Sequence, residues 1–166
     1  QLLDYRKAED KKFVLRASKT NILDFSKIII ADFEQEAKKR NIDFTLATSN
    51  PELEVYIDHN LMDKVYFNLL SNAFKFTPEG GRVDIYLKSG HSEDTETTLS
   101  NYAEIIIADT GIGIAPEEIE HIFERFYQIR NHLNNSNIGT GIGLHLTRSL
   151  VELHHGHIHA ENNPEG

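Results

Sequence analysis

A short stretch, NLLSNAFKFTPEGG at residues 68–81, carries polar groups that a helix does not need. Its first half has helical apolar spacing, yet Asn68 and Asn72 stand four residues apart and Lys75 follows three later. All three therefore share one helix face. Asn is a mediocre helix former that prefers caps and turns. Two carboxamides and an ammonium together suggest a binding face, while the simpler alternative is an exposed polar face.

Two glycine-bearing motifs point to an anionic ligand. DTGIGI at 109–114 ends a strand-like run, and GTGIGL at 139–144 opens a helix-like one. Neither is a Walker A motif, because no G-K-[ST] follows, and neither fits a Rossmann fingerprint. A glycine loop that opens a helix offers free backbone N–H groups and a favourable dipole to a phosphate. Gly139, Gly141 and Gly143 allow that approach, although either motif alone could be only a turn.

The composition excludes several classes of site. The chain has 166 residues and no cysteine, which suits one domain and excludes disulfides, thiolate catalysis and Cys-ligated zinc. A net charge of −9 argues against contact with nucleic acid or an anionic membrane, because such surfaces need a basic stripe. A phosphate ligand remains compatible with this charge, since a small pocket needs only a few local donors. We see neither an apolar run that could span a bilayer nor a signal peptide.

Apolar periodicity predicts helices in short runs, separated by paired strands. This order favours an α+β fold, a two-layer sandwich in which helices cover one face of a mixed sheet. We expect strands at residues 11–18, 42–48, 53–57, 82–89, 102–109 and 157–161, and helices at 21–41, 58–76, 115–128 and 142–156.

The ends of these helices carry their own signals. Asn21 with Asp24 three residues on resembles a capping box. Asp58 is the expected N-cap of the helix that bears the two asparagines. Gly156 is the expected C′ residue of the last helix, where a left-handed conformation favours glycine.

Four stretches taken in order are much more specific than any one alone: NLLSNAFKFTPEGG, DTGIGI, IFERFYQ and GTGIGL. Together they closely resemble the N, G1, F and G2 boxes of the catalytic ATP-binding domain of bacterial sensor histidine kinases. That domain belongs to the superfamily of gyrase, chaperone, histidine kinase and mismatch-repair ATPases, whose sandwich is called the Bergerat fold. The resemblance covers residues 12–160, and its character is that of kinases from hybrid two-component systems.

The resemblance implies that ATP and Mg²⁺ bind at the N box. Asn72 matches the asparagine whose side-chain oxygen binds Mg²⁺, an ion that prefers hard oxygens and keeps waters. Asn68 would hydrogen-bond the phosphates or the waters of the metal, and Lys75 would neutralise phosphate charge. Phe76 would lie against the adenine.

The resemblance assigns the base and the phosphate chain to the two glycine motifs. Asp109 would accept a hydrogen bond from the adenine amino group, because a carboxylate has no proton to donate. Gly111 and Gly113 would let the chain turn tightly beside the purine. The residues of the G2 box that would bind the nucleotide are Gly139, Thr140, Gly141, Gly143 and Leu144.

Residues 114–138 match the lid over ATP in this family. Their asparagine-rich part fits a segment that orders when nucleotide binds. Arg125 could reach the γ-phosphate during transfer, or pair with Glu124 or a neighbour at the surface. Phe123 and Phe126 would attach the lid to the core or to the phosphoacceptor helix.

The catalytic residues implied are Asn68, Lys75 and Arg125. The ATP hydrolases of the superfamily have a glutamate at the position of Asn68, and an amide cannot act as a base. This difference favours transfer to a nucleophile, a histidine on a helical hairpin, over hydrolysis. None of the nine histidines is followed by the Glu/Asp and Pro pattern expected at a phosphoacceptor. We therefore expect the acceptor upstream of Gln1.

The domain organisation also follows from the resemblance. Residues 1–11 match the end of the dimerisation and phosphoacceptor hairpin, and residues 12–166 match the catalytic domain without its last strand. The implied partners are the upstream hairpin of the same protein and a response regulator receiver domain, downstream or in trans. The parent protein would be a membrane-anchored homodimer with this domain in the cytoplasm.

Three other interpretations are weaker. HHGHIH at 154–159 could bind a metal, but histidine tracts alone are only compositional evidence. A conformational ATPase clamp of the same superfamily is disfavoured by Asn68 and the FERF segment. A module that uses the fold only for protein contact is disfavoured by Asn72, Asp109 and the G2 box.

Overall fold

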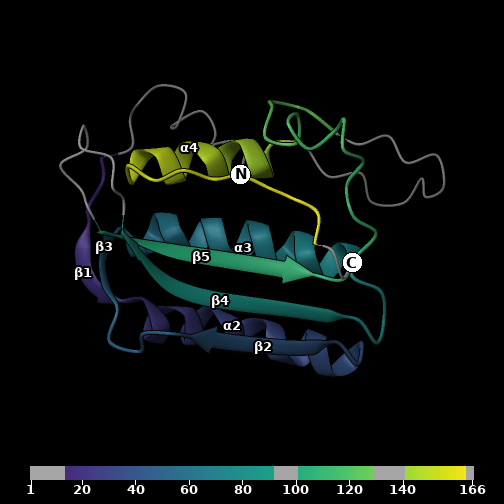
Figure 1. Cartoon of the computed structure of the whole chain (residues 1–166), viewed down its shortest axis with the longest axis horizontal. Coiled ribbons are helices and arrows are strands. Elements are labelled where there is room, and N and C mark those ends of the chain that lie inside the picture. The colour runs from purple at the N-terminus through teal and green to yellow at the C-terminus, as the bar shows by residue number, and fades with distance from the viewer. Residues whose placement is uncertain (1–13, 92–100, 129–140, 164–166) are drawn as a thin grey trace.

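The computed structural model describes residues 14–91, 101–128 and 141–163. The helices and strands, in chain order, are β1 (Ser18–Asn21), α2 (Ile22–Lys39), β2 (Asp43–Thr48), β3 (Glu54–Ile57), α3 (His59–Phe76), β4 (Arg82–His91), β5 (Asn101–Asp109) and α4 (Gly143–Leu153). In Figure 1 the sheet of β2, β4 and β5 lies in front of α2 and α3, and α4 lies above them at the top of the view. This arrangement confirms the predicted α+β sandwich.

The larger sheet is mixed, as predicted. Strand β2 pairs with β4 in parallel, and β4 pairs with β5 in antiparallel orientation. The last ladder places Val83 opposite Asp109, so the predicted base-binding carboxylate lies where β5 ends. A separate two-stranded sheet joins β1 and β3 at one edge of the molecule (Figure 1).

The hydrophobic core lies between this sheet and the helices. Alternate residues of β4, namely Val83, Ile85 and Leu87, are buried, because neighbouring side chains of a strand point to opposite faces. The helices contribute apolar residues at helical spacing, among them Leu70 of α3 and Leu150 of α4, which are fully buried. The packing of α4 on α3, and of α3 on β5, brings the N box close to the two glycine motifs.

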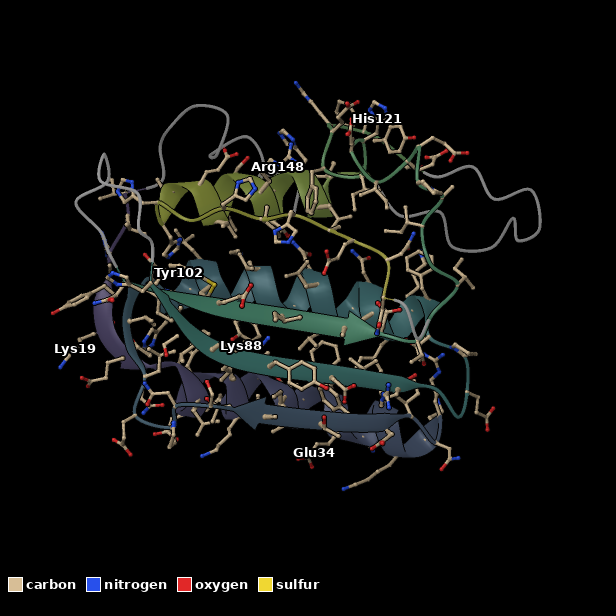
Figure 2. The ribbon with its side chains drawn as sticks, viewed as in Figure 1. Lys19, Glu34, Lys88, Tyr102, His121 and Arg148 are labelled. Atoms are coloured by element: carbon tan, nitrogen blue, oxygen red, sulfur yellow. The ribbon has the colours of Figure 1, made fainter. Side chains whose placement is uncertain are left out.

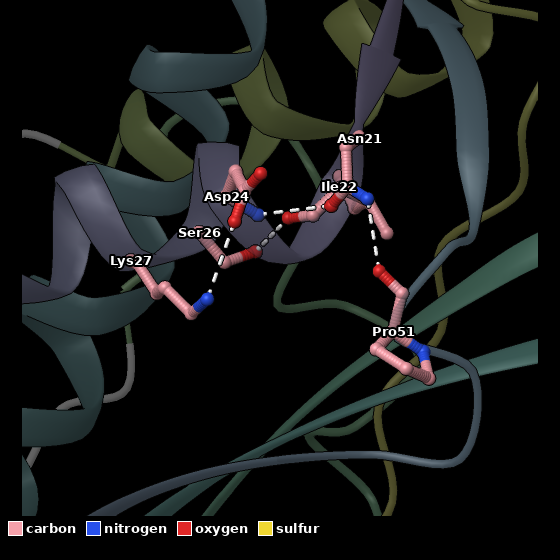
Figure 3. Close-up of polar contacts among 6 residues, drawn as sticks. All are labelled: Asn21, Ile22, Asp24, Ser26, Lys27 and Pro51. Carbon is pink, nitrogen blue, oxygen red and sulfur yellow. Dashed lines mark hydrogen bonds and ion pairs between the residues drawn. The ribbon is translucent and has the colours of Figure 1, made fainter.

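The first turn of α2 is capped by Asn21, as predicted (Figure 3). Its Oδ1 accepts a hydrogen bond from the Asp24 backbone N–H at 3.1 Å, and its Nδ2 donates to the Pro51 carbonyl at 2.8 Å. The Asp24 carboxylate binds Lys27 at 3.2 Å instead of reaching back to the cap. The capping box is therefore half formed, because the shorter aspartate has a cation within reach.

The end of α4 corrects one prediction. The residue with positive φ is His155, at 59°, and Gly156 follows it. The N–H of Gly156 donates to Val151 O and that of His155 donates to Glu152 O, so the helix ends in a complete Schellman motif. Glycine at 156 relieves a tight contact, since a Cβ there would lie 3.0 Å from the Val151 side chain and 3.3 Å from its carbonyl oxygen.

Two predicted strands differ in the structure. The first strand begins at Ser18, because the Arg16 N–H donates to the Asp58 carboxylate rather than to a ladder. Residues 157–161 are described but form no strand, and the nearby Asn162 bonds the backbone of Ile114 instead. The predictions for residues 1–13 lie outside the described part of the chain.

The expected helix at 115–128 is a series of turns. The backbone hydrogen bonds of this segment include short-range turns, such as His121 N–H to Glu118 O at 3.0 Å and Glu124 N–H to His121 O at 2.8 Å. Phe126 has a φ of 61°, which a regular helix does not contain. Tertiary contacts thus override a periodic pattern that is too short to nucleate a stable helix by itself.

Arg40 holds the end of α3 in place. Its guanidinium donates to the carbonyl oxygens of Phe74 and Thr77, and the Arg40 carbonyl accepts from the Gly80 N–H at 3.1 Å. These carbonyls belong to the last turn and the C-cap of α3, where a cation is favoured. Arg40 therefore connects the end of α2 to the turn at the end of the N box.

Replacing Arg40 by methionine is expected to lower the free energy of unfolding by about 1–2 kcal/mol, because charge-assisted hydrogen bonds are lost. Urea denaturation measures the effect. The control is Lys39→Met in the same helix turn, where the side chain is exposed and a change within about 0.5 kcal/mol is expected. Equal stability of the two variants would show that the Arg40 contacts contribute nothing.

Candidate functional site

The polar face predicted on α3 exists in the structure. Asn68, Asn72 and Lys75 follow one another along the second half of the helix, with increasing exposure from Asn68 to Lys75. Asn68 is 9% exposed, Asn72 is half-buried and Lys75 is exposed. The face is therefore partly enclosed, which disfavours the alternative of an ordinary solvated face for Asn68.

Asn68 joins α3 to the start of α4. Its Nδ2 donates to the Gly143 carbonyl and to Thr147 Oγ1, each at 3.4 Å. Thr147 Oγ1 itself donates to the Gly143 carbonyl at 3.0 Å, and Thr147 is fully buried. Thr147 is not among the site residues predicted from the sequence, although its place four residues after Gly143 puts the two on one helix face.

The first turn of α4 has no side-chain cap. Ile142 occupies the N-cap position and makes no capping hydrogen bond through its side chain. Because the first N–H groups of a helix lack intrahelical partners, they can be bonded by a ligand. Gly143 and Leu144 are the first two residues of this turn and both are half-buried.

The G2 motif also touches the segment before it. Gly141 has a φ of 66°, and a Cβ there would lie 2.8 Å from the Phe126 backbone. The Phe126 N–H donates to the Gly141 carbonyl at 3.0 Å. Glycine at 141 is thus required by conformation and by space. Gly139 and Thr140 lie outside the described residues, so their predicted role stays a prediction.

The end of α3 meets the G1 motif. A Cβ placed on Gly111 would lie 2.5 Å from Asp109 Oδ1 and 2.9 Å from the Phe76 carbonyl oxygen. Asp109 Oδ1 accepts a hydrogen bond from the Gly111 N–H at 2.8 Å. The Phe76 ring is 46% exposed, and Lys75 Nζ lies 5.2 Å from its centroid. The predicted base-binding residues are therefore neighbours, and only glycine fits between them.

Residues 114–128 pack on α4 through Phe123. Its ring is 3% exposed, the guanidinium of Arg148 lies 4.7 Å from the ring centroid, and a ring nitrogen of His145 lies 3.2 Å from its carbonyl oxygen. Figure 2 shows Arg148 on α4 and His121 on the neighbouring turns. The prediction that Phe123 attaches this segment to the core agrees with this packing.

Phe126 and Arg125 are exposed instead. The Phe126 ring is 56% exposed, and the Arg125 guanidinium lies 4.7 Å from its centroid. The prediction that Phe126 packs into the core is therefore wrong. The backbone of Phe126, rather than its ring, contacts the G2 motif, and the Arg125 side chain packs on the Phe126 ring.

Two titrating groups of this segment are perturbed by their neighbours. The Tyr127 hydroxyl donates to the Glu118 carboxylate, and this bond raises the pKa of Tyr127 to about 12. The Glu124 carboxylate lies 2.7 Å from His121 Nδ1, and this hydrogen bond raises the pKa of His121. Both pairs are internal to the turns, where they stabilise the local backbone path.

The histidine-rich end of the chain has a structural role. His154 Nδ1 lies 2.7 Å from the Leu150 carbonyl oxygen, and its Nε2 accepts from the Asp58 N–H at 3.0 Å. A carbonyl can only accept and an amide N–H can only donate, so the ring is a neutral Nδ1–H tautomer. Within the described residues no group of three or more His, Cys, Asp or Glu is arranged to hold a metal ion.

The family of the chain is decided by a family model. A model described as histidine kinase-, DNA gyrase B-, and HSP90-like ATPase matches residues 57–166. The chain belongs to this ATPase family. The matched residues include α3, both glycine motifs and α4, which are the parts brought together above.

The most similar relatives include histidine kinases. Histidine kinase P4 of Formosa agariphila is 38% identical over 161 residues, which cover 95% of this chain and 11% of that protein. Sensor histidine kinase WalK of Bacillus subtilis is 30% identical over 161 residues, which cover 97% of this chain and 25% of that protein. The chain thus spans about a tenth to a quarter of the length of these two relatives.

Solved structures of the same fold are also histidine kinase domains. The nucleotide-free catalytic domain of histidine kinase ThkA matches with a TM-score of 0.73 and 27% identity, covering 90% of each chain. A complex of ThkA with the response regulator protein TrrA matches with a TM-score of 0.72 and 25% identity, covering 99% of this chain and 44% of that chain. The predicted fold and the resemblance to histidine kinases are confirmed. No helix among the described residues is long and apolar enough to cross a membrane.

Proposed function

We propose that this ATPase-family domain binds Mg-ATP and transfers the γ-phosphoryl group to a histidine on an upstream domain. The observation that carries the proposal is the Asn68–Gly143 contact, which joins the polar face of α3 to the uncapped start of α4. An N–H-rich helix start beside carboxamide and ammonium groups suits a triphosphate chain. The family match supports nucleotide binding by this site.

The adenine would lie at the end of α3. Asp109 would accept from the adenine amino group, and the exposed ring of Phe76, whose backbone carbonyl lies beside Gly111, would lie against the base. Gly111 and Gly113 would let the chain turn tightly beside the purine. Along the phosphates, the ligands would be backbone groups of the G2 motif, which comprises Gly139, Thr140, Gly141, Gly143 and Leu144.

The donor set fits Mg²⁺ held mainly by the nucleotide. Asn72 is a half-buried carboxamide one helix turn from Asn68, and its oxygen is a hard ligand of the kind Mg²⁺ prefers. The ion, when bound, would neutralise charge on the phosphates. Lys75 and Arg125, both exposed at the edge of the site, would add positive charge near the phosphates.

Asn68 would act in transfer without acting as a base. Its Nδ2 is engaged with α4, so it would fix the helix start against the phosphates. The Asn68 amide cannot deprotonate water. The nucleophile would therefore be the acceptor histidine. That nitrogen would bond the γ-phosphorus while the bond to the bridging oxygen breaks and ADP leaves.

The larger protein would resemble its relatives. Residues 1–11 would end the dimerisation and phosphoacceptor hairpin, and 12–166 would form the catalytic domain of a homodimeric kinase. A response regulator would receive the phosphoryl group, by analogy with the ThkA–TrrA complex. The domain would lie in the cytoplasm and the parent would be membrane-anchored.

Purified alone, the chain is expected to bind ATP without labelling itself from γ-labelled ATP. A dimerisation hairpin from the parent protein, once added, should become labelled on histidine through an acid-labile, base-stable bond. Labelling should require Asn72 and be weakened by Arg125→Ala. Incubation with labelled ATP, followed by mass spectrometry of the site, measures this.

One control and two contradicting outcomes test the proposed transfer. Dimerisation of the hairpin should be unaffected by either substitution, which separates chemistry from assembly. Phosphate on any histidine of residues 1–166 without the hairpin would contradict the upstream acceptor. Steady ATP hydrolysis without labelling of the hairpin would favour an ATPase clamp instead.

A further inference from the structure

The loop that carries the base-binding motif, residues 109–114, is held at its first end by β4. The Thr110 N–H donates to the Arg82 carbonyl at 3.0 Å, and the Arg82 N–H donates to Thr110 Oγ1 at 2.9 Å. These bonds continue the β4–β5 ladder by one residue. Asp109, at the end of β5, is thus positioned by the sheet itself.

The second end of the loop is held by one side chain from the C-terminal segment. Asn162 Oδ1 accepts from the Ile114 N–H at 2.9 Å, and Asn162 Nδ2 donates to the Ile114 carbonyl at 2.6 Å. Asn162 thereby satisfies both backbone groups of one residue, as a neighbouring strand would. The two residues are 48 positions apart in the chain, so the contact joins distant segments.

Gly113 fits the same arrangement. Its φ is 68°, and a Cβ there would lie 3.3 Å from Asn162 Oδ1. The loop therefore passes close beneath Asn162 and needs glycine at this point for its conformation. Ile112 lies between the two fixed ends and is 67% exposed, so its side chain does not hold the loop by packing into the core. Hydrogen bonds at both ends restrict the backbone conformations of this glycine-rich loop.

We propose that Asn162 is a positioning residue for nucleotide binding, since it fixes the far end of the base-binding loop. The inference rests on the proposed ATP site, and it adds a residue outside the four motifs. Asn162 does not itself touch the base-binding carboxylate, which the sheet holds independently. Its loss should therefore weaken binding of every nucleotide while leaving the choice between bases unchanged.

Calorimetric titration of Asn162→Ala with ATP, ADP and GTP tests this prediction. Affinity for each nucleotide should fall on the order of fivefold to tenfold, which corresponds to two exposed hydrogen bonds. The ratio of ATP to GTP affinity should stay that of the starting protein. The matched control is Glu161→Ala, an exposed neighbour in the same segment, which should bind as the starting protein does.

Amide hydrogen exchange without nucleotide supplies a second, independent measurement. In Asn162→Ala the Ile114 amide should exchange faster, while the Thr110 amide, bonded to Arg82, should keep its protection. Unchanged Ile114 exchange, or equal nucleotide affinity of Asn162→Ala and the starting protein, would overturn the inference. If the unaltered protein binds no nucleotide, the proposed function is refuted. Faster Ile114 exchange in Asn162→Ala would in that case still show that Asn162 holds the loop.

Discussion

Replacing Asn72 by alanine is expected to abolish the Mg²⁺-dependent part of the ATP affinity while leaving the fold intact. Asn72 is the half-buried carboxamide of α3 that we propose as the only protein ligand of the ion among the described residues. Mg²⁺ keeps near-octahedral oxygen coordination, so in the variant a water would replace the Asn72 oxygen and the ion would lose its direct bond to the domain. Alanine is the best helix former, so α3 should form equally well.

Calorimetry with and without Mg²⁺ measures this effect. In the starting protein Mg²⁺ should strengthen ATP binding, and in Asn72→Ala the two titrations should coincide. The control is Asn60→Ala, an exposed asparagine in the first turn of the same helix, which should keep the full dependence on Mg²⁺. Unchanged Mg-ATP binding by Asn72→Ala would refute the assignment of the ligand.

ATP and ADP are expected to bind at least about tenfold more tightly than GTP, through Asp109. A charge-assisted hydrogen bond lost in a partly buried site costs about 1.5–3 kcal/mol, and 1.4 kcal/mol is a factor of ten. Guanine has a carbonyl where adenine has its amino group, so it would leave the carboxylate opposite an acceptor. Competition titrations of the three nucleotides measure the preference.

Asp109→Asn is the sharper variant for this test. An amide oxygen can still accept from the Gly111 N–H, which now bonds Asp109 Oδ1 at 2.8 Å, so the loop should keep its shape. The new NH₂ would face the adenine amino group, and the preference for ATP over GTP should collapse. Equal affinities of the unaltered protein for ATP and GTP would rule out base selection by this carboxylate.

Much of the fold could be predicted because its signals are local. Helix α3 has an aspartate cap and an apolar stripe within its own sequence, and the alternation of β4 identifies its buried face without knowledge of its neighbours. The α+β class followed from the order of these elements. The motifs could be matched to a family because each is a contiguous stretch with fixed spacing.

Contacts between distant segments decided the rest. Residues 115–128 have helical periodicity, yet Phe123 packs on α4 and the Phe126 backbone bonds Gly141. The last segment forms no strand but provides Asn162 to Ile114. Neither Arg40 nor Thr147 is marked by a motif, because the groups they bond lie on other elements of the fold.

By itself, the sequence determined which residues make up the four motifs and therefore which family the chain resembles, because each motif is set by residue type and spacing; the nucleotide-binding roles of its residues stay predictions. Tertiary structure alone decided how these motifs meet, as when the Asn68 amide turned toward Gly143 and glycine at 111 let Phe76 approach Asp109. The physical reason is the distance along the chain over which each kind of interaction acts. Caps and periodicity act within a few residues, whereas packing and hydrogen bonding between segments depend on where the whole chain has folded.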